Sequence, residues 1–360
     1  MNRPHRSSFS NPSRLVSIAT AVPPFVIEQR VAETASRAIF GSRLPAYERM
    51  AGVFASTGID RRYSVSPESW FTQSHGWPER TAAYLDGASL LFEQVVREAL
   101  ERAHVGASAV DAVVMVSSTG ILTPSLEARL LPRMGFRADV ERTPVFGLGC
   151  AGGVTGLGIA SRLAQARPNT TVLLVVIELC TLAFRADRLT KADVIATALF
   201  GDGAAAAIVS SDPRLPGRAT FCGATEHLWP NTLDVMGWDV DDIGLGVMLS
   251  RSLPTFVEQR YRASFDEAMT RLGIARDAVE RFVCHPGGTK VLDAIEAALS
   301  VPSGTLEDER SVMRDFGNMS APTVFFVLDR ALARGLPQTT ILTALGPGFT
   351  ASYVALENAA

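Results

Sequence analysis

The sequence predicts an α/β protein whose sheets are mainly buried. Apolar runs of strand length alternate with longer stretches in which apolar residues recur every three or four positions. The chain has 360 residues, of which 47% are hydrophobic and 20% charged, so it is long enough for two domains or for one domain with a composite core. Strand–helix alternation of this kind is typical of sheets covered by helices on both faces.

Each expected element follows from its own pattern. In the first half, a helix with one apolar and one charged face is predicted over residues 89–103, and a second helical pattern begins at residue 154. Buried strands are predicted over residues 112–117, 145–148, 172–177 and 204–209. The segment 211–218 (SDPRLPGR) is rich in turn formers and predicts a connector. In the second half, strands are predicted over 281–284, 340–344 and 351–356, and helices over 290–299 and 321–334.

Composition and charge narrow the function classes. The formal net charge of −3 disfavours a nucleic-acid partner, which would normally meet a basic surface. The four cysteines form no CxxC pair or zinc-like spacing, and a chain of this size needs no disulfides, so we expect reduced thiols in the cytoplasm and no metal. Residues 1–13 are polar and predict a flexible tail, and no apolar run is long enough to span a bilayer.

Cys150 lies where a predicted strand meets a predicted helix, in the stretch VFGLGCAGG (145–153). A lone cysteine in an apolar stretch is usually a small core residue. A thiol at the start of a helix, however, feels the positive end of the helix dipole, which favours the reactive thiolate. The neighbouring glycines would also let a substrate carbonyl approach the backbone.

Two further residues could act with this thiol. His285 ends a predicted strand and precedes Pro-Gly-Gly, where an imidazole can face a cavity or serve only a structural role. Asn318 can cap the following helix, or its amide can donate to a developing oxyanion. The stretch LFGDGAAAA (199–207) lacks the GKS/T of a phosphate loop. Cysteine, histidine and asparagine in these positions together indicate an activated-thiol enzyme.

Five ordered motifs resemble those of one family. They are FGLGCAGG (146–153), ALFGDGAAA (198–206), HPGGTKVLDAIE (285–296), GNMSAPTV (317–324) and GPGFT (346–350). The chain resembles, from about residue 13 to 356, the type III polyketide synthases, the chalcone-synthase-like branch of the thiolase superfamily. The resemblance implies a thiolase-like layered αβαβα fold built from two similar halves, residues 14–212 with Cys150 and residues 213–360 with His285 and Asn318. Stretches 147–154, 188–203 and 229–247 most resemble bacterial alkylresorcinol and alkylpyrone synthases.

The resemblance also implies a mechanism. Cys150 would take an acyl group from an acyl-CoA, and an imidazolium on His285 would keep its thiol ionised. His285 and Asn318 would hold the thioester oxygen of malonyl-CoA while it loses CO₂. The resulting carbanion would attack the acyl-Cys150 thioester, and repeated extension and ring closure would give an alkylresorcinol or alkylpyrone. This chemistry implies no cofactor; the substrates are acyl-CoA and malonyl-CoA.

Motif positions imply the substrate pocket. Phe200 matches a gating phenylalanine of the plant enzymes, whereas Val247 replaces a second one. Ala183 replaces a threonine, Trp238 a glycine, and Thr123 a methionine that reaches across the dimer interface. Further pocket residues expected from the motifs are Cys180, Leu199, Ser320, Gly346, Pro347 and Gly348. The expected CoA-binding residues are Lys290, Gly287, Arg49 and Arg61, with Arg62 as a further candidate.

The resemblance implies a homodimer, with CoA thioesters as small-molecule partners and a fatty-acid synthase or acyl carrier protein as a conceivable donor of the starter. Two alternatives stay open at this stage. One is a ketoacyl synthase III-like enzyme that performs a single condensation with an acyl carrier protein. The other is a non-catalytic acyl-binding protein on the same scaffold.

Overall fold

The computed structural model describes residues 11–359. Its strands are β1 (Arg14–Ala21), β2 (Phe25–Glu28), β3 (Arg61–Ser64), β4 (Ala112–Val116), β5 (Glu141–Val145), β6 (Thr171–Leu179), β7 (Asp202–Ser210), β8 (Ala219–Leu228), β9 (Met236–Val240), β10 (Leu245–Leu249), β11 (Arg281–Cys284), β12 (Thr339–Gly346) and β13 (Thr350–Asn358). Its helices are α1 (Gln29–Phe40), α2 (Tyr47–Met50), α3 (Val53–Ser56), α4 (Trp77–Ala103), α5 (Leu126–Leu130), α6 (Gly152–Ala166), α7 (Lys191–Leu199), α8 (Leu253–Leu272), α9 (Thr289–Leu299), α10 (Glu307–Phe316) and α11 (Thr323–Ala333).

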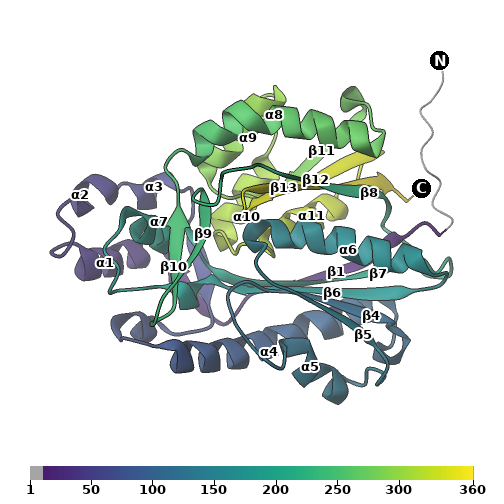
Figure 1. Ribbon diagram of the computed structural model, residues 1–360, viewed down its shortest axis with the longest axis horizontal. Helices are drawn as coiled ribbons and strands as arrows, with labels where there is room; N and C mark the ends of the chain where they lie inside the picture. Colours follow the sequence, from purple (N-terminus) through teal and green to yellow (C-terminus); the bar gives the residue numbers. More distant parts are fainter. Residues whose placement is uncertain (1–10, 360) are drawn as a thin grey trace.

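The main sheet has two parts that face each other. Nine strands follow the order β11-β12-β13-β8-β1-β7-β6-β4-β5, and only two residue pairs, Arg14–Thr220 and Leu15–Ala219, join β1 to β8. Figure 1 shows α6 and α11 between the two parts, α8 and α9 over one outer face and α4 and α5 under the other. The five layers are therefore α, β, α, β, α, which confirms the predicted thiolase-like fold.

The central layer is filled by buried apolar side chains. One cluster of buried apolar residues joins α6 and α11 to strands of both sheet parts, for example Val114, Leu174, Leu342 and Val354. Every residue of β6 and of β7 is buried, because helices cover both faces of these strands. This explains why these strands are continuous apolar runs in the sequence.

Most predicted elements are confirmed, and one is wrong. The predicted strand at residues 145–148 is displaced, because β5 ends at Val145 and residues 146–148 form the loop before Cys150. It is also less buried than expected, since β5 is an edge strand with only one neighbour, β4. Its exposed side is the open edge of the sheet.

Three expectations concern the chain as a whole: a flexible tail, reduced cysteines and the lack of a membrane-spanning segment. The predicted tail at residues 1–13 lies mostly outside the described residues, although Ser13 is buried and its hydroxyl lies 2.9 Å from that of Ser161. The four cysteines form no disulfide. Between residues 11 and 359, none of the helices has the length and apolar character that a membrane span requires.

Candidate active site

Cys150 lies in a short 3₁₀ turn, Gly149–Ala151, which leads directly into α6. The turn packs against the loop between β12 and β13: a Cβ placed on Gly149 would lie 2.7 Å from Cδ of Pro347, and one on Gly346 would overlap the backbone at Leu148. Gly149 also has a φ of +47°, which L side chains rarely adopt. The small residues around Cys150 are therefore required by packing as well as by any substrate.

A chain of hydrogen bonds connects the three predicted catalytic residues. The hydroxyl of Ser320 donates to Sγ of Cys150 at 3.4 Å, and the backbone N–H of Ser320 donates to Oδ1 of Asn318 at 2.8 Å. Nδ2 of Asn318 donates to the carbonyl of Gly287 at 3.3 Å, and the N–H of Gly287 donates to the carbonyl of His285 at 3.0 Å. The fold thus brings together residues that are far apart in the sequence.

Backbone pairing fixes Asn318 and His285. The N–H of Asn318 donates to the carbonyl of Leu199 at 2.9 Å, and its own carbonyl accepts from Gly201 at 3.0 Å. The N–H of His285 donates to the carbonyl of Thr343 at 2.8 Å, which continues the parallel pairing of β11 with β12. Both side chains therefore project from rigid elements.

Burial keeps the thiol and the imidazole neutral. It raises the pKa of Cys150 to about 11, although the hydrogen bond from Ser320 acts in the opposite direction. It lowers the pKa of His285 to about 3. In this structure burial therefore favours the neutral thiol and the neutral imidazole over the expected thiolate–imidazolium pair. Both ring nitrogens of His285 are buried without a hydrogen-bond partner among the described residues, so they are available to a substrate.

A cavity of about 60 Å³ lies beside Cys150. Its walls include several residues predicted for the pocket: Cys180, Phe200, Trp238, Val247, Ser320 and Pro347. Trp238 is fixed there because its Nε1 donates to the carbonyl of Ser118 at 2.8 Å. His285 and Asn318 do not line this cavity, and the hydrogen bonds described above connect them to Cys150.

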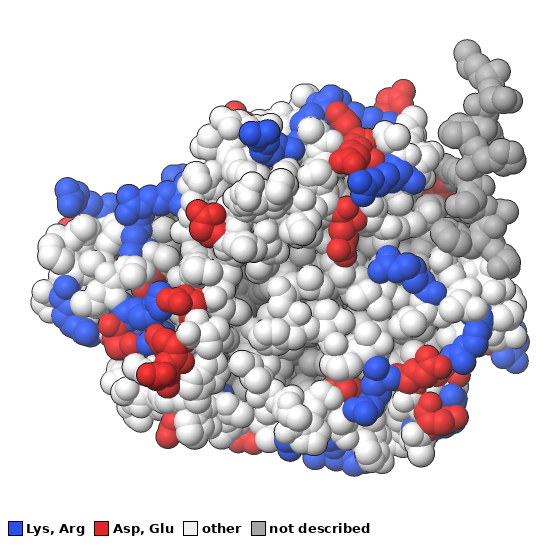
Figure 2. Space-filling view, viewed as in Figure 1, with Lys and Arg blue, Asp and Glu red and all other residues white. Residues whose placement is uncertain are grey.

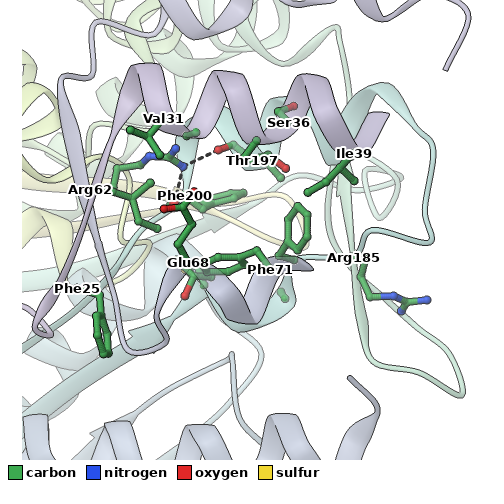
Figure 3. Close-up of a pocket in the computed structure, with 18 of the residues that line it drawn as sticks. Phe25, Val31, Ser36, Ile39, Arg62, Glu68, Phe71, Arg185, Thr197 and Phe200 are labelled. Atoms are coloured by element: carbon green, nitrogen blue, oxygen red, sulfur yellow. Dashed lines mark hydrogen bonds between the residues drawn. The ribbon is translucent and has the colours of Figure 1, made fainter. Parts of the chain in front are cut away.

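A second, larger pocket of about 360 Å³ adjoins the first (Figure 3). Cys180, Phe200 and Val247 line both, and Ala183 lines the larger one. Figure 3 shows side chains of α1 on one side of the pocket and Glu68 and Phe71 on the other, with Phe200 deeper between them. The sequence analysis did not foresee the wall made by β2 and α1. We call the place where Cys180, Phe200 and Val247 separate the two spaces the neck.

Four of the predicted pocket residues line neither cavity. Thr123 is exposed on the surface. Leu199 is buried in the apolar cluster beneath α7 and α8, and only its carbonyl reaches Asn318. Gly346 supports the turn at Cys150, and the carbonyl of Gly348 accepts a hydrogen bond from Thr232. These last three residues line neither cavity and instead support the backbone around the site.

The predicted CoA-binding residues are partly brought together. The hydroxyl of Thr289 donates to the carbonyls of Ser56 and Thr57, which places exposed Lys290 near the end of α3. Figure 2 shows Lys and Arg side chains along the edge of the molecule where α2 and α3 lie in Figure 1. Exposed Arg49 lies in the last turn of α2, whereas exposed Arg61 lines an open pocket that also contains three carboxylates. Gly287 is engaged with Asn318.

Arg62 is not a CoA-binding residue. Its side chain is buried, and Nη1 donates to the carbonyls of Thr197 at 2.5 Å and Phe200 at 2.9 Å. It belongs to the wall of the larger pocket, as Figure 3 shows. A strand places neighbouring residues on opposite faces, so exposed Arg61 and buried Arg62 point in opposite directions.

Glu178 is a site residue that the sequence analysis missed. It is fully buried, lines the cavity beside Cys150, and accepts hydrogen bonds from the N–H of Ser118 and the hydroxyl of Thr119. Burial raises its pKa to about 8. A sequence pattern could have identified Glu178, because a carboxylate directly follows the buried apolar run 172–177.

Comparison with known proteins gives consistent matches along the chain. Residues 4–213 match the family described as "Chalcone and stilbene synthases, N-terminal domain", and residues 221–358 match the corresponding C-terminal domain. The chain is 33% identical to a candidate chalcone synthase of Bacillus subtilis (strain 168), over 94% of this chain and 97% of the relative. It is 35% identical to a 1,3,6,8-tetrahydroxynaphthalene synthase of Streptomyces peucetius subsp. caesius, over 84% of this chain and 81% of the relative.

A solved structure also matches closely. The 1,3,6,8-tetrahydroxynaphthalene synthase of Streptomyces coelicolor A3(2), described as a bacterial type III polyketide synthase, superposes with a TM-score of 0.91. The match covers 96% of this chain and 99% of that one, at 26% sequence identity.

We predict that the wild type loses stability as pH rises because of Glu178, and that Glu178→Gln does not show this loss. Because burial raises the pKa of Glu178 from an ordinary value of 4.5 to about 8, the folded protein retains a proton that the unfolded chain releases. The free energy of unfolding of the wild type should fall relative to that of the variant between these two pH values, by at most about 1.4 kcal/mol per pH unit, and then level off. Urea denaturation of both proteins at pH 4.5 to 9 measures the difference. A difference that is independent of pH would show that Glu178 ionises normally.

Proposed function

Because the chain belongs to the chalcone and stilbene synthase family and is a type III polyketide synthase, we propose that its preferred starters are medium-to-long fatty acyl-CoAs. Cys150 receives the acyl group, malonyl-CoA extends it, and ring closure gives an alkylresorcinol or an alkylpyrone. The observation that carries this proposal is the larger pocket, which adjoins the cavity at Cys150 through the neck.

The lining of the larger pocket suits an alkyl chain. Its wall is mostly apolar and includes Phe25, Val31, Ile39, Phe71 and Phe184. Each buried CH₂ group contributes roughly 0.8 kcal/mol, so a chain that extends past the neck gains affinity with every added carbon. Ala183 keeps the side of this pocket open, and Val247 leaves more space in the neck than a phenylalanine would.

The first chemical step is acyl transfer to Cys150. Since burial favours neutral forms of both groups, we assign to His285 the role of accepting the thiol proton as the sulfur attacks the thioester. The tetrahedral intermediate then collapses, CoA leaves as a thiol with the proton that His285 accepted, and a thioester remains on Cys150. This assignment replaces the imidazolium role that we expected from the sequence.

Decarboxylation of malonyl-CoA requires stabilisation of an enolate oxygen. A protonated ring nitrogen of His285 and the amide of Asn318 are the proposed donors. Among the described residues, Nδ2 of Asn318 donates one hydrogen bond, to the carbonyl of Gly287, and an amide nitrogen has a second N–H to donate. The carbanion attacks the acyl-Cys150 carbonyl, the new carbon–carbon bond forms as the bond to sulfur breaks, and Cys150 leaves as a thiolate while the extended chain is carried by CoA. The proposed steps involve acyl transfer and decarboxylation, for which we propose no cofactor.

The binding partners follow from surface features. We assign the CoA phosphates to exposed Lys290 and Arg49, which lie on elements near one another. We assign the dimer interface to the open edge of β5, because an uncovered edge strand offers unpaired backbone groups. Ile121 and Phe146 are 53% and 58% exposed on the loops that follow β4 and β5, and Figure 2 shows a hollowed face with few charges at its centre.

The proposed starter is tested by competition. The enzyme is incubated with malonyl-CoA and an equimolar panel of acetyl-, hexanoyl-, lauroyl-, palmitoyl- and benzoyl-CoA, and the products are identified by mass spectrometry. We expect alkyl products from the longer starters to dominate. Products that form from malonyl-CoA alone, or mainly from benzoyl-CoA, would contradict the proposal. A requirement for malonyl-loaded acyl carrier protein would favour the single-condensation alternative.

The two catalytic roles should separate by mutation. Cys150→Ala should abolish acyl loading and product but leave slow CO₂ release from malonyl-CoA, because His285 and Asn318 remain. Asn318→Ala should keep acyl loading and slow CO₂ release by about 10²–10³-fold, the usual effect of losing an oxyanion donor. Radiolabelled acyl transfer and ¹⁴CO₂ release measure the two steps. Cys222→Ala, whose side chain lines neither cavity, is the control. Normal product formation by Cys150→Ala would refute the nucleophile assignment.

Filling the larger pocket should shorten the preferred starter. Ala183 is 7% exposed and lines that pocket, so a phenylalanine there would occupy space proposed for the chain. We expect Ala183→Phe to shift preference from palmitoyl-CoA to hexanoyl-CoA while CO₂ release from malonyl-CoA stays within about twofold of wild type. Ala183→Ser, which barely changes the volume, is the matched control. An unchanged chain-length preference in Ala183→Phe would place the acyl chain elsewhere.

A further inference from the structure

The hairpin formed by β9 and β10 presents two different faces. Trp238 and Val247 are paired across it, and both line the cavity beside Cys150. The next pair is Asp239 and Gly246. Because successive residues of a strand point to opposite faces, this second pair faces away from Trp238 and Val247. The outer face of the hairpin is therefore available to hold the inner face in position.

Arg188 occupies that outer face. Its Nη1 donates to Oδ2 of Asp239 at 2.8 Å. Its guanidinium also covers Gly246 so closely that a Cβ on Gly246 would overlap it. A second carboxylate of the hairpin, Asp241, lies 3.9 Å from Nη1. The absence of a side chain at Gly246 thus makes room for the arginine.

The same guanidinium reaches α7. Its Nε lies 3.6 Å from Oδ1 of Asp193, which is 6% exposed. The other oxygen of Asp193 accepts hydrogen bonds from the N–H and hydroxyl of Thr190, which caps the start of α7. Asp193 is therefore fixed to the helix, and the helix leads directly to Phe200. Arg188 connects the element that carries Phe200 with the element that carries Val247.

We propose that Arg188 is a positioning residue that sets the width of the neck between the two cavities and thereby selects long starters. Phe200 and Val247 are two of the three residues that form the neck, and Arg188 is the charged group that lies between their elements on the outer side. It lines neither cavity and acts only through the hairpin and α7. This inference rests on the proposed function of the larger pocket.

The contact of Arg188 is local, so its loss should shift the β9–β10 hairpin relative to α7 without unfolding the protein. The turn of the hairpin is held separately, because both oxygens of Asp241 accept hydrogen bonds from Arg185. Figure 3 shows the Arg185 guanidinium pointing away from the pocket. Trp238 is held independently by the carbonyl of Ser118. Without Arg188 the hairpin stays attached at these points, and the freedom gained is between β10 and α7.

The test compares two starters in one tube. A long chain must cross the neck to reach the larger pocket, whereas a short chain remains beside Cys150. In a competition between palmitoyl-CoA and hexanoyl-CoA, we expect Arg188→Met to lower the ratio of long to short product by about threefold or more. Methionine keeps an apolar stem over Gly246 but no charge. Partial activity of the protein does not change this ratio, so a merely structural role would not move it.

Two further variants distinguish loss of the Arg188 contact from misfolding of Arg188→Met. Asp239→Asn removes the hairpin carboxylate, which is 55% exposed, and should lower the ratio in the same direction. Arg188→Lys should restore only part of the wild-type ratio, because an ammonium group lacks the planar fork that spans two carboxylates. Arg97→Ala, on the outer face of α4 with a 72% exposed side chain paired to Glu93, is the control and should leave the ratio unchanged.

A double-mutant cycle identifies the contact itself. Gly246→Ala should displace the guanidinium and so lower the ratio in the wild-type background. The substitution should add no backbone strain, because the φ of Gly246 is not positive. In the Arg188→Ala background the same change meets no guanidinium and should have little further effect. Additive effects, or an unchanged or raised ratio in Arg188→Met, would overturn the inference. A wild type that shows no preference for palmitoyl-CoA would instead refute the proposed function.

Discussion

The site depends on the burial of two helices side by side between the two parts of the sheet. α6 and α11 start at the same end of the central layer, where a Cβ on Gly153 would overlap the backbone carbonyl of Ala321. Cys150 lies just before α6, and Ser320 lies just before α11. The hydrogen bond from Ser320 to Cys150 follows from this close approach. Everything else in the site is assembled around these two helix starts.

Burial also decides the charges of the site. The pKa of Cys150 is raised, that of His285 is lowered and that of Glu178 is raised, in each case chiefly by desolvation. Each shift favours the neutral form, so the resting cavity carries little charge. In such a dry cavity a developing negative charge gains much from a correctly placed donor. The low polarity that suits an alkyl chain thus also strengthens the proposed oxyanion contacts.

Chemistry and selectivity are carried by different parts of the molecule. The proposed catalytic residues project from the layered core, whose strands and helices enclose one large apolar cluster. The neck and the larger pocket are instead built largely from α1, α7 and the β9–β10 hairpin, which lie outside the main sheet (Figure 1), together with Cys180, which follows β6. Ion pairs such as those of Arg185 and Arg188 hold these outer elements. Changes there can alter the space for a substrate with little disturbance of the core.

The sequence by itself determined the layered fold and the family, and it predicted Cys150, His285 and Asn318 as catalytic residues, because buried strands, helix starts and ordered motifs are local patterns. It misplaced the strand before Cys150, since an edge strand has no partner to bury its open side. It also took Arg62 for a surface residue and overlooked Glu178. The pKa values, the two adjoining pockets and the contact of Arg188 with Asp239 and Asp193 were decided only by the tertiary structure. The physical reason is that desolvation and cavity shape depend on residues that are distant in the chain and meet only when the protein folds.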